Sequence, residues 1–374
     1  MAGIYIHLPF CSSFCLYCDF YSEIDGREQR RRYLNALKSE ISERANYFAG
    51  VLPDTIYMGG GTPSLFDVEY IADLADTLRN RFELAALREF TLEANPDDVT
   101  PQKLDGWLRA GVNRLSIGVQ SFCDDHLARM RRRHTSTQAI NAFRMAREAG
   151  FNNISLDLIF GFEGLSEEQW RYNIALLSDL YPEHVSCYQM SIEPGSKLAS
   201  LADSGRYQEP PQEICAAHYS ILQQMLEKAG YRQYEVSNFA IPGRESIHNS
   251  YYWERIPYLG LGASAHSFDG HSCRCWNISD MKSYIDAMED NTSSDMRSYE
   301  ILSEDDKFNE QIMLGLRKIA GLPLSSLENS RLAIIKPVLD YLSSTGDIVS
   351  EGGNIRIPAE RMFVSDGIMK QLFL

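Results

Sequence analysis

Residues 4–20 read IYIHLPFCSSFCLYCDF, and this stretch decides the fold. Its apolar, β-branched start predicts a strand. The strand delivers Cys11, Cys15 and Cys18 onto one short loop in a C-x3-C-x2-C pattern. Thiolates are soft ligands that suit zinc or an iron–sulfur cluster. A structural zinc ion takes four protein ligands, and an iron–sulfur cluster is usually held by four cysteines. This loop contains only three cysteines.

The spacing leaves three interpretations of this loop open. A [4Fe-4S] cluster held by three cysteines leaves one iron open to a small chelating molecule, and this spacing resembles the radical SAM signature. In that superfamily the open iron binds the amino and carboxylate groups of S-adenosylmethionine, and the cluster's electron cleaves its sulfonium. A zinc loop would instead take its fourth ligand from elsewhere in the chain. The C-x2-C pair could also be a redox motif.

The composition of the chain restricts its class. A chain of 374 residues, 44% hydrophobic and 23% charged, is long enough for a large globular domain and a smaller one. A formal net charge of -15 disfavours a nucleic-acid partner, because phosphate binding needs clustered cations. Eight cysteines, three of them close together, are unlike a secreted disulfide framework and favour a reducing, cytoplasmic location.

Membrane segments and targeting signals are not expected. The first ten residues contain His7 and Pro9 and lack a basic segment, so a signal peptide is not predicted. No apolar run approaches the roughly twenty residues of a membrane span. Any membrane contact would therefore be peripheral.

Short apolar runs alternate with amphipathic segments from residue 3 to about 190. This alternation predicts a parallel sheet with right-handed crossovers, whose polar residues collect at the carboxyl ends of the strands. The predicted strands are Gly3–Leu8, Thr55–Gly59, Glu89–Asn95, Asn113–Gln120, Asn152–Phe160 and His184–Met190. The predicted helices are Glu28–Phe48, Val68–Arg81, Pro101–Ala110, Ser136–Ala149 and Ser166–Leu180.

The pattern changes after residue 195. We expect a helix at Pro211–Ala229, a strand at Tyr231–Phe239 and a turn-rich, aromatic stretch from Pro242 to Trp276. Helices from 303 to 318 and from 331 to 343, a hairpin through 346–358 and a last helix from 365 follow. Helices followed by a β wing suggest a small winged-helix-like domain. We therefore expect three units, at residues 1–210, 211–295 and 296–374.

Glycines and an acid end the second and third predicted strands. The turn from Gly59 to Ser64 reads GGGTPS, where the backbone can approach a ligand closely and bare N–H groups can face an anion. Such a turn can also end a strand for local reasons. Glu93, in the segment LEANPD, could receive the ammonium or ribose of a ligand, or it could be a capping or surface acid.

Polar residues also end the later strands. Gln120 follows RLSIGV, and Arg132 lies in RRRHT, where a guanidinium could hold a ligand carboxylate; Arg133 could equally belong to a solvated basic patch. Asp157 sits in an apolar run, where a charge is costly unless it meets a ligand hydroxyl or an arginine. Ser191 and Glu193 either face the same mouth or cap a turn.

Ten motifs in order resemble one family. YIHLPFCSSFCLYCDF, GGGTPS, LEANPD, RLSIGVQSF, RRRHT, LDLIFG, IEPGS, YEVSNFA, HNSYYW and YLGLGASAHS occur between residues 4 and 267. The set is similar to the oxygen-independent coproporphyrinogen III oxidase (HemN-type) family of radical SAM proteins and its HemW heme chaperone branch. The resemblance implies a partial (β/α)6 barrel with a C-terminal α+β, winged-helix-like domain.

The resemblance also implies cofactors and site residues. Cys11, Cys15 and Cys18 would ligate a [4Fe-4S] cluster. The positions implied to contact S-adenosylmethionine are Tyr5, Tyr17, Gly60, Gly61, Thr62, Glu93, Gln120, Arg132, Asp157 and Ser191. The H-N-x-x-Y-W motif of the family implies a heme site with His248 as the ligand. Without the resemblance, His248 could be a satisfied turn residue and its aromatic neighbours part of the core.

Departures from the oxidase pattern favour the HemW branch. The oxidases carry a fourth cysteine where this chain has Phe20, and a longer segment before the cluster loop. We therefore expect a heme chaperone that binds the cluster, S-adenosylmethionine and heme, and transfers heme to acceptor proteins. The alternatives are porphyrinogen decarboxylation and, more distantly, radical methyl transfer, so enzymatic activity stays open. Cys273 and Cys275 could bind metal or be idle thiols.

Overall fold

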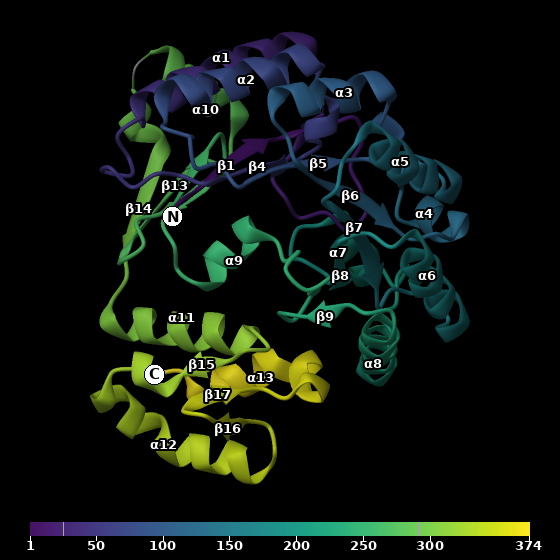
Figure 1. Ribbon diagram of the computed structural model, residues 1–374, viewed down its shortest axis with the longest axis vertical. Helices are drawn as coiled ribbons and strands as arrows, with labels where there is room; N and C mark the ends of the chain where they lie inside the picture. Colours follow the sequence, from purple (N-terminus) through teal and green to yellow (C-terminus); the bar gives the residue numbers. More distant parts are fainter. Residues whose placement is uncertain (25, 291) are drawn as a thin grey trace.

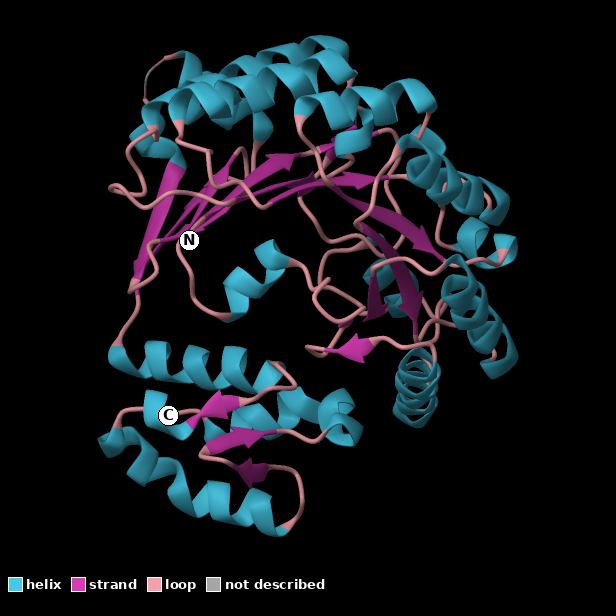
Figure 2. Ribbon diagram, viewed as in Figure 1, coloured by secondary structure: helices cyan, strands magenta, loops and turns pink. Residues whose placement is uncertain are grey.

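The computed structural model describes residues 1–24, 26–290 and 292–374, and its central feature is a twelve-stranded sheet (Figures 1 and 2). Six neighbouring strands run parallel in the order in which they occur along the chain. They are β1 (Gly3–Leu8), β4 (Thr55–Gly60), β5 (Glu89–Ala94), β6 (Arg114–Gln120), β7 (Ile154–Phe160) and β8 (His184–Gln189). The predicted parallel sheet of a partial barrel is confirmed.

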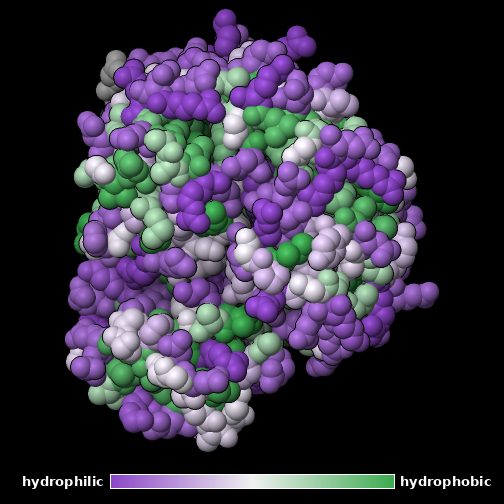
Figure 3. Space-filling model, viewed as in Figure 1, coloured by the Kyte–Doolittle hydropathy of each residue, from purple (hydrophilic) through white to green (hydrophobic). Residues whose placement is uncertain are grey.

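Helices connect these strands and cover the outer side of the sheet (Figure 1). They are α1 (Arg27–Glu43), α2 (Val68–Arg81), α3 (Pro101–Ala110), α4 (Asp124–Arg129), α5 (Ser136–Ala149) and α6 (Glu167–Leu180). The side-chain oxygens of Thr100, Thr135 and Ser166 cap α3, α5 and α6 by accepting backbone N–H groups. Hydrophilic side chains cover most of the visible outer surface of α1, α2 and α3 (Figure 3).

One helix is shorter than predicted. α1 ends at Glu43 instead of Phe48, and the chain continues through turns in which Tyr47 N–H donates to the Arg44 carbonyl. These turns direct the Phe48 ring into the core, where it lies 6.0 Å from the Phe82 ring in an edge-on contact. Packing of one aromatic side chain therefore overrides the helical pattern.

The register of the strands decides which side chains share a layer inside the barrel. Tyr57, Thr91 and Arg114 are successive register partners on β4, β5 and β6. Side chains alternate between the two faces of a strand, so Glu93 and Ser116 point to the same interior. They are also register partners, one layer nearer the carboxyl ends of the strands.

Further strands extend the sheet at both ends. β9 (Arg232–Gln233) and β10 (Asn238–Ala240) continue it beyond β8, and β11 to β14 continue it beyond β1. The latter four are β11 (Tyr258–Leu261), β12 (His266–Phe268), β13 (Cys273–Asn277) and β14 (Arg297–Ile301). Helices α7 (Lys197–Asp203), α8 (Gln212–Lys228) and α10 (Met281–Glu289) lie between these strands in sequence.

The single strand predicted at Tyr231–Phe239 is wrong. The chain leaves the sheet between Gln233 and Asn238, because the fully buried carboxylate of Glu235 gathers local donors. It accepts the backbone N–H of Ser237 at 2.8 Å and the side-chain amide of Asn238 at 2.6 Å. The result is two short antiparallel strands in place of one long strand.

Helix α9 (Ile247–Trp253) lies in the stretch that the sequence analysis described only as turn-rich. The Ser246 hydroxyl caps it by accepting Asn249 N–H, and the buried Glu89 carboxylate accepts the N–H of His248 at 2.9 Å. α9 contacts β4 on one side and α11 (Glu304–Arg317) on the other (Figure 1). It therefore closes the barrel at the end opposite the carboxyl ends of the strands.

The C-terminal residues form the predicted arrangement of helices and a hairpin. α11 is followed by β15 (Leu322–Pro323), α12 (Asn329–Ser344), β16 (Val349–Glu351), β17 (Asn354–Arg356) and α13 (Ser365–Met369), with a three-stranded antiparallel sheet. The Arg317 guanidinium on α11 donates to Glu235 at 2.7 Å and lies over the Trp253 ring. In the part of the chain that the structure describes, no helix has the length and apolarity to span a membrane.

A buried carboxylate joins α1 to the extension of the sheet. Glu40 is fully buried; its Oε2 accepts the Gly262 N–H and the Tyr284 hydroxyl, each at 2.8 Å, and its Oε1 accepts the Asn277 amide at 2.8 Å. The Arg297 guanidinium lies 3.5 Å away. This one side chain connects α1, α10, β13 and β14.

We predict that Glu40→Ala lowers the free energy of unfolding by about 3–5 kcal/mol, because it leaves the buried donors of Gly262, Asn277 and Tyr284 without an acceptor. The matched control is Glu43→Ala, since Glu43 also pairs with Arg297 but is partly exposed; its cost should stay below about 1 kcal/mol. Urea denaturation measures both. Equal effects of the two substitutions would contradict this role of Glu40.

Candidate cofactor-binding site

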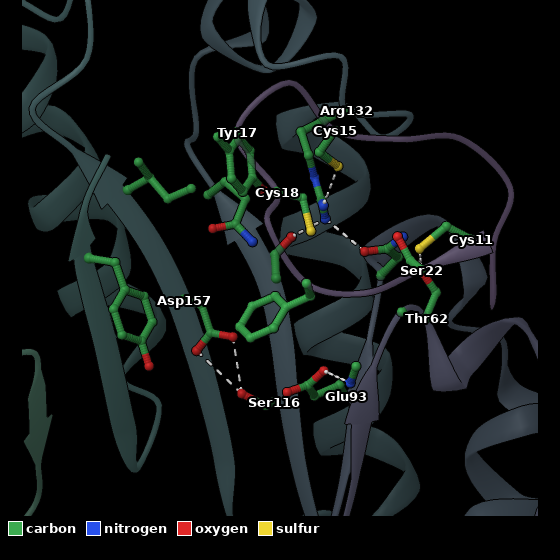
Figure 4. Close-up of a pocket in the computed structure, with 18 of the residues that line it drawn as sticks. Cys11, Cys15, Tyr17, Cys18, Ser22, Thr62, Glu93, Ser116, Arg132 and Asp157 are labelled. Carbon is green, nitrogen blue, oxygen red and sulfur yellow. Dashed lines mark hydrogen bonds between the residues drawn. The ribbon is translucent and has the colours of Figure 1, made fainter. Parts of the chain in front are cut away.

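A cavity of about 400 Å³ lies at the carboxyl ends of the parallel strands, beneath the cysteine loop (Figure 4). All three cysteines of the loop line it, as do nine of the ten residues expected to contact S-adenosylmethionine. These nine are Tyr17, Gly60, Gly61, Thr62, Glu93, Gln120, Arg132, Asp157 and Ser191. Tyr5 is not among the lining residues; its hydroxyl lies 3.0 Å from His7 Nδ1.

The cysteine loop is anchored at its base and near its middle. At the base, β2 (Phe10–Cys11) pairs with β3 (Glu23–Ile24), which closes the loop. Near the middle, Leu16 N–H donates to the Met130 carbonyl at 3.2 Å. The second contact ties the loop to the segment just before Arg132, so both sides of the cavity mouth are held together.

The three thiols face the cavity and none is in a disulfide. Burial raises the pKa of Cys18 to about 11, and burial also raises the pKa of Cys11. Cys11 Sγ lies 3.5 Å from Thr62 Oγ1, and Cys15 Sγ accepts Arg132 Nη1–H at 3.3 Å. Binding a metal centre as thiolates would therefore release protons from the loop.

In this conformation the three thiols are not gathered around a single metal position. Within residues 1–24, 26–290 and 292–374, no three Cys, His, Asp or Glu side chains are gathered closely enough to hold one metal ion. A tetrahedral zinc with bonds of about 2.3 Å would draw its sulfur ligands to within about 3.8 Å of one another. A four-iron cluster takes each thiolate on a different iron and accepts a wider spacing.

The glycine turn after β4 packs against the cysteine loop. Gly61 N–H donates to the Leu8 carbonyl at 3.0 Å, and Thr62 N–H donates to the Phe10 carbonyl at 2.9 Å. A Cβ on Gly61 would lie 2.7 Å from the Phe10 backbone nitrogen, and Gly60 has a φ of +105°. The expectation that these N–H groups face an anion is therefore wrong for Gly61 and Thr62: they hold the loop instead.

Glu93 is a buried carboxyl group that titrates near neutral pH. Its Oε1 accepts the Tyr57 hydroxyl at 2.8 Å and its Oε2 accepts the Gly60 N–H at 3.2 Å. Burial raises its pKa to about 7 despite these two hydrogen bonds. An ammonium group of a ligand beside Glu93 would favour the ionised form.

Arg132 connects the cysteine loop to two strand ends (Figure 4). Its Nη2 donates to the Asn95 side-chain oxygen and to the Gly118 carbonyl, each at 2.7 Å, while Nη1 reaches Cys15. Its Nε is buried without a hydrogen-bond partner. The guanidinium is thus fixed in place and keeps one donor for a ligand.

Asp157 is held by serines. Ser116 Oγ donates to its Oδ2 at 3.0 Å (Figure 4). Ser155 Oγ donates to its Oδ1 at 3.1 Å. Burial raises its pKa, against the lowering effect of hydrogen bonds from Ser186 and Ser116. The sequence led us to expect a ligand hydroxyl or an arginine beside this acid; the described contacts are serine hydroxyls, and one edge of the carboxylate faces the cavity.

Gln120 has a strained backbone at the end of β6. Its φ is +64°, and the register with β7 shifts between Gly118 and Gln120. This conformation is uncommon for a residue with a side chain and costs about 1–3 kcal/mol. A Cβ on Gly118 would lie 2.8 Å from the Gln120 amide nitrogen, so glycine there leaves room for the amide beside the cavity.

The mouth of the cavity carries the remaining residues of interest. Ser191 is exposed and lines the mouth, whereas Glu193 does not. Arg133 pairs with Asp97 and Asp98, so it is an ion-paired residue at the rim. Phe20 lines the mouth with 66% of its surface exposed, so the second position after the third cysteine presents an apolar ring to solvent.

His248 lies apart from the cavity, in α9. It is 1% exposed; its Nδ1 lies 2.8 Å from Thr55 Oγ1 and its Nε2 lies 2.9 Å from the Tyr252 hydroxyl. Burial lowers its pKa to about 3, so the ring is neutral. Both ring nitrogens are hydrogen-bonded in this conformation, and binding iron would require Nε2 to exchange Tyr252 for the metal.

Sequence reasoning missed several polar residues of the cavity. Arg114, Ser116, Ser186 and Asn249 all line it. The available signal was the alternation of Arg114, Ser116, Gly118 and Gln120 along one strand, which places polar groups on a single face. Asn249 lies in the HNSYYW motif, but the motif did not predict that it lines this cavity, because α9 was not predicted.

Cys273 and Cys275 lie on β13 and do not line the cavity. Cys275 is buried, and its sulfur accepts Arg44 Nη2–H at 3.4 Å. Cys273 Sγ contacts the carbonyl of Arg274. These contacts match structural thiols, and neither residue belongs to a metal-binding group among the described residues.

The amino-acid sequence is similar to the sequences of known radical SAM proteins. A model of the radical SAM superfamily matches residues 5–177. The chain is 39% identical over 323 residues to a Bacillus subtilis protein named heme chaperone HemW, with 86% of this chain and 85% of that protein covered. It is 38% identical over 265 residues to the Escherichia coli heme chaperone HemW, with 71% and 69% covered.

A solved structure shows the same fold. Coproporphyrinogen III oxidase from Escherichia coli, described as a radical SAM enzyme, superposes with a TM-score of 0.81. The match covers 100% of this chain and 90% of that chain at 24% sequence identity. At this identity the likeness supports the architecture, including the C-terminal helices and hairpin, and not the activity.

We predict that Glu93→Gln stabilises the protein at pH 8 by about 1–3 kcal/mol and has little effect near pH 4. The pKa of Glu93 is raised from 4.5 to about 7 by burial, so the folded state binds more protons than the unfolded state between these values. The free energy of unfolding of the wild type therefore falls as the pH rises through that range, and the substitution removes this fall.

Thermal or urea unfolding from pH 4 to pH 8 measures the difference. Glu209→Gln, at an exposed position, is the control and should follow the wild type. If Glu93→Gln and the wild type keep the same difference at every pH, Glu93 does not titrate near neutral pH.

Proposed function

Since the chain belongs to the HemW family within the radical SAM superfamily, we propose that it is a heme chaperone that binds a [4Fe-4S] cluster, S-adenosylmethionine and heme, and transfers heme to acceptor proteins. The observation that carries the proposal is the combination of a three-thiol loop over a polar cavity with Phe20, two positions after the third cysteine.

Three cysteines and the cavity below them would hold the first two cofactors. Cys11, Cys15 and Cys18 would ligate the cluster, which when bound supplies an electron to a sulfonium ligand at its open iron. Glu93 would attract the ligand's ammonium group, and the free Nε–H of Arg132 would orient its carboxylate. Asp157, held by Ser116 and Ser155, would accept ligand hydroxyls.

The other expected contacts shape the cavity. Gly60, Gly61 and Thr62 keep the loop at a fixed distance from β4. Gln120 directs a carboxamide into the cavity from a strained position. Tyr17 and Ser191 border the mouth, and the Tyr5 ring stacks beside the Tyr57 ring with 6.1 Å between the centroids.

His248 is the proposed heme ligand. Its imidazole is neutral, which iron ligation requires, and Tyr252 and Trp253 lie on the same short helix. Heme binding would follow the release of Nε2 from Tyr252. The single hydrogen bond involved is worth about 0.5–1.5 kcal/mol, which is small beside an iron–imidazole bond.

Oxidation of a porphyrinogen is the second candidate function. The polar cavity supports it, because Glu93, Gln120, Arg132 and Asp157 are all in place. The chain differs from the oxidase pattern at Phe20. We therefore propose heme transfer, and not porphyrinogen decarboxylation, as the main function.

Partners and location follow from the same proposal. The partners are heme and heme-acceptor proteins, with no nucleic acid and at most peripheral membrane contact. We place the protein in the cytoplasm, because thiols that hold a cluster must stay reduced. All eight cysteines are free.

We predict that Cys15→Ser lowers the iron and sulfide content of anaerobically reconstituted protein from about four of each per chain to less than half of that value. Colorimetric iron and sulfide assays measure it. Cys273→Ser is the matched control and should keep the wild-type content, because Cys273 lies outside the cavity. Equimolar zinc without sulfide in the wild type would instead support the zinc loop.

We predict that His248→Ala weakens heme binding at least about tenfold and alters the Soret band. Tyr252→Phe should strengthen heme binding roughly two- to tenfold, because the hydroxyl no longer competes for Nε2. Spectrophotometric heme titration of the three proteins measures both effects.

An unchanged heme spectrum in His248→Ala would remove this residue from the heme site. Protoporphyrinogen formation from coproporphyrinogen III, S-adenosylmethionine and reductant would contradict the chaperone assignment. Movement of heme from the loaded wild type to an apo heme protein, without that product, would support it.

A further inference from the structure

Arg114, the first residue of β6, is a buried cation for which the described residues supply no hydrogen-bond or ion-pair partner. Its side chain lines the cavity and is 1% exposed. Its Nε and Nη1 are fully buried and have no hydrogen-bond acceptor, and among the described residues no carboxylate forms an ion pair with it. A guanidinium stays charged in proteins, and a buried charge is costly unless it is paired.

The two acids of the cavity do not fill this role. Glu93 accepts its hydrogen bonds from Tyr57 and Gly60, and Asp157 accepts from serines. Burial raises the pKa of both carboxyl groups, and the positive charge of Arg114 acts against that rise. Arg114 is therefore near enough to influence both acids electrostatically while its own donors stay unused.

Arg114 lies at the end of the cavity that is remote from the cysteine loop. Gln120 lies six positions further along β6, which corresponds to about 20 Å at roughly 3.3 Å per residue. Arg132, the proposed partner of the S-adenosylmethionine carboxylate, is fixed at the loop end by Asn95 and Gly118. The two arginines therefore serve different parts of the cavity.

Asn249 brings a second donor to the same end. It projects from α9 into the cavity and has its backbone N–H capped by Ser246. No hydrogen bond engages its side-chain amide within the described part of the chain. The barrel strand and the closing helix thus each contribute a free N–H donor group to one place.

We infer that Arg114 and Asn249 form a subsite for a carboxylate of an alkyl acid at the floor of the cavity. A guanidinium fork matches a planar carboxylate with two parallel hydrogen bonds, and the amide supplies another donor. A doubly charged phosphate fits less well, because it carries twice the negative charge of a carboxylate into a cavity that Asp157 and Glu93 also line.

Two kinds of ligand carry such a carboxylate. One is a tetrapyrrole with a propionate arm, and the other is a free short-chain acid. The propionate arm rests on the proposed function, since the subsite would then bind one propionate group of the heme. The second is independent of heme, and the experiment below separates them.

The experiment titrates hemin and hemin dimethyl ester into the reconstituted full chain, and measures stabilisation by sodium propionate relative to sodium chloride in thermal unfolding. The variants are Arg114→Gln, which removes the fork, and Asn249→Asp, which keeps Arg114 but sets a carboxylate beside the ligand. Arg133→Gln is the control, because Arg133 lies at the mouth and is already paired.

The expected result is that the wild type binds hemin roughly tenfold or more tightly than the ester. Both variants should lose this preference while binding the ester as the wild type does, and Arg133→Gln should keep it. Stabilisation by propionate alone, lost in both variants, assigns the subsite to a free acid.

The inference is overturned if the wild type shows neither the hemin preference nor stabilisation by propionate, or if both persist in the two variants. Failure of the wild type to bind hemin or its ester, together with Arg114-dependent stabilisation by propionate, would overturn the proposed function and leave the subsite standing. If Arg114→Gln does not fold, Asn249→Asp decides the outcome.

Discussion

The parallel pairing of β1 and β4 to β8 is the constraint on which the rest of the structure depends. Parallel strands bring their carboxyl ends to one edge, so the cysteine loop after β1 and the polar residues after the other strands must meet there. The residues that line the upper part of the cavity follow from this geometry, whereas Asn249 reaches the cavity from α9. The loop adds its own constraint, because the N–H groups of Gly61 and Thr62 hold its backbone in place.

The interior of the barrel contains arginines at two levels. At the loop end, Arg132 is surrounded by acceptors and by the Cys15 sulfur. At the floor, Arg114 has none among the described residues, and α9 closes the barrel below it. Glu93 and Asp157 lie between the two arginines. A ligand with an ammonium group, hydroxyls and carboxylates could satisfy these groups together, which an apolar ligand could not.

The sequence predicted the six strands, the longer helices between them and many of the residues that line the cavity, because local periodicity and strand-end motifs carry that information. The six-residue helix α4 (Asp124–Arg129) was not predicted. The sequence did not predict α9 either, since seven residues are too few to show a helical period and the cap at Ser246 acts with the distant Glu89. It also missed Arg114, whose lack of a partner is a tertiary property. His248 was identified by its motif, but its two hydrogen bonds, to Thr55 and Tyr252, depend on packing between α9 and β4.

The central claim is that three thiolates hold a cluster whose fourth iron faces the cavity and receives S-adenosylmethionine. Electron paramagnetic resonance of the dithionite-reduced, anaerobically reconstituted protein, with and without S-adenosylmethionine, tests this most directly. The account predicts the signal of a reduced [4Fe-4S] cluster that changes when S-adenosylmethionine is added. An unchanged spectrum at saturating S-adenosylmethionine, or no cluster signal from protein with its full iron content, would contradict it.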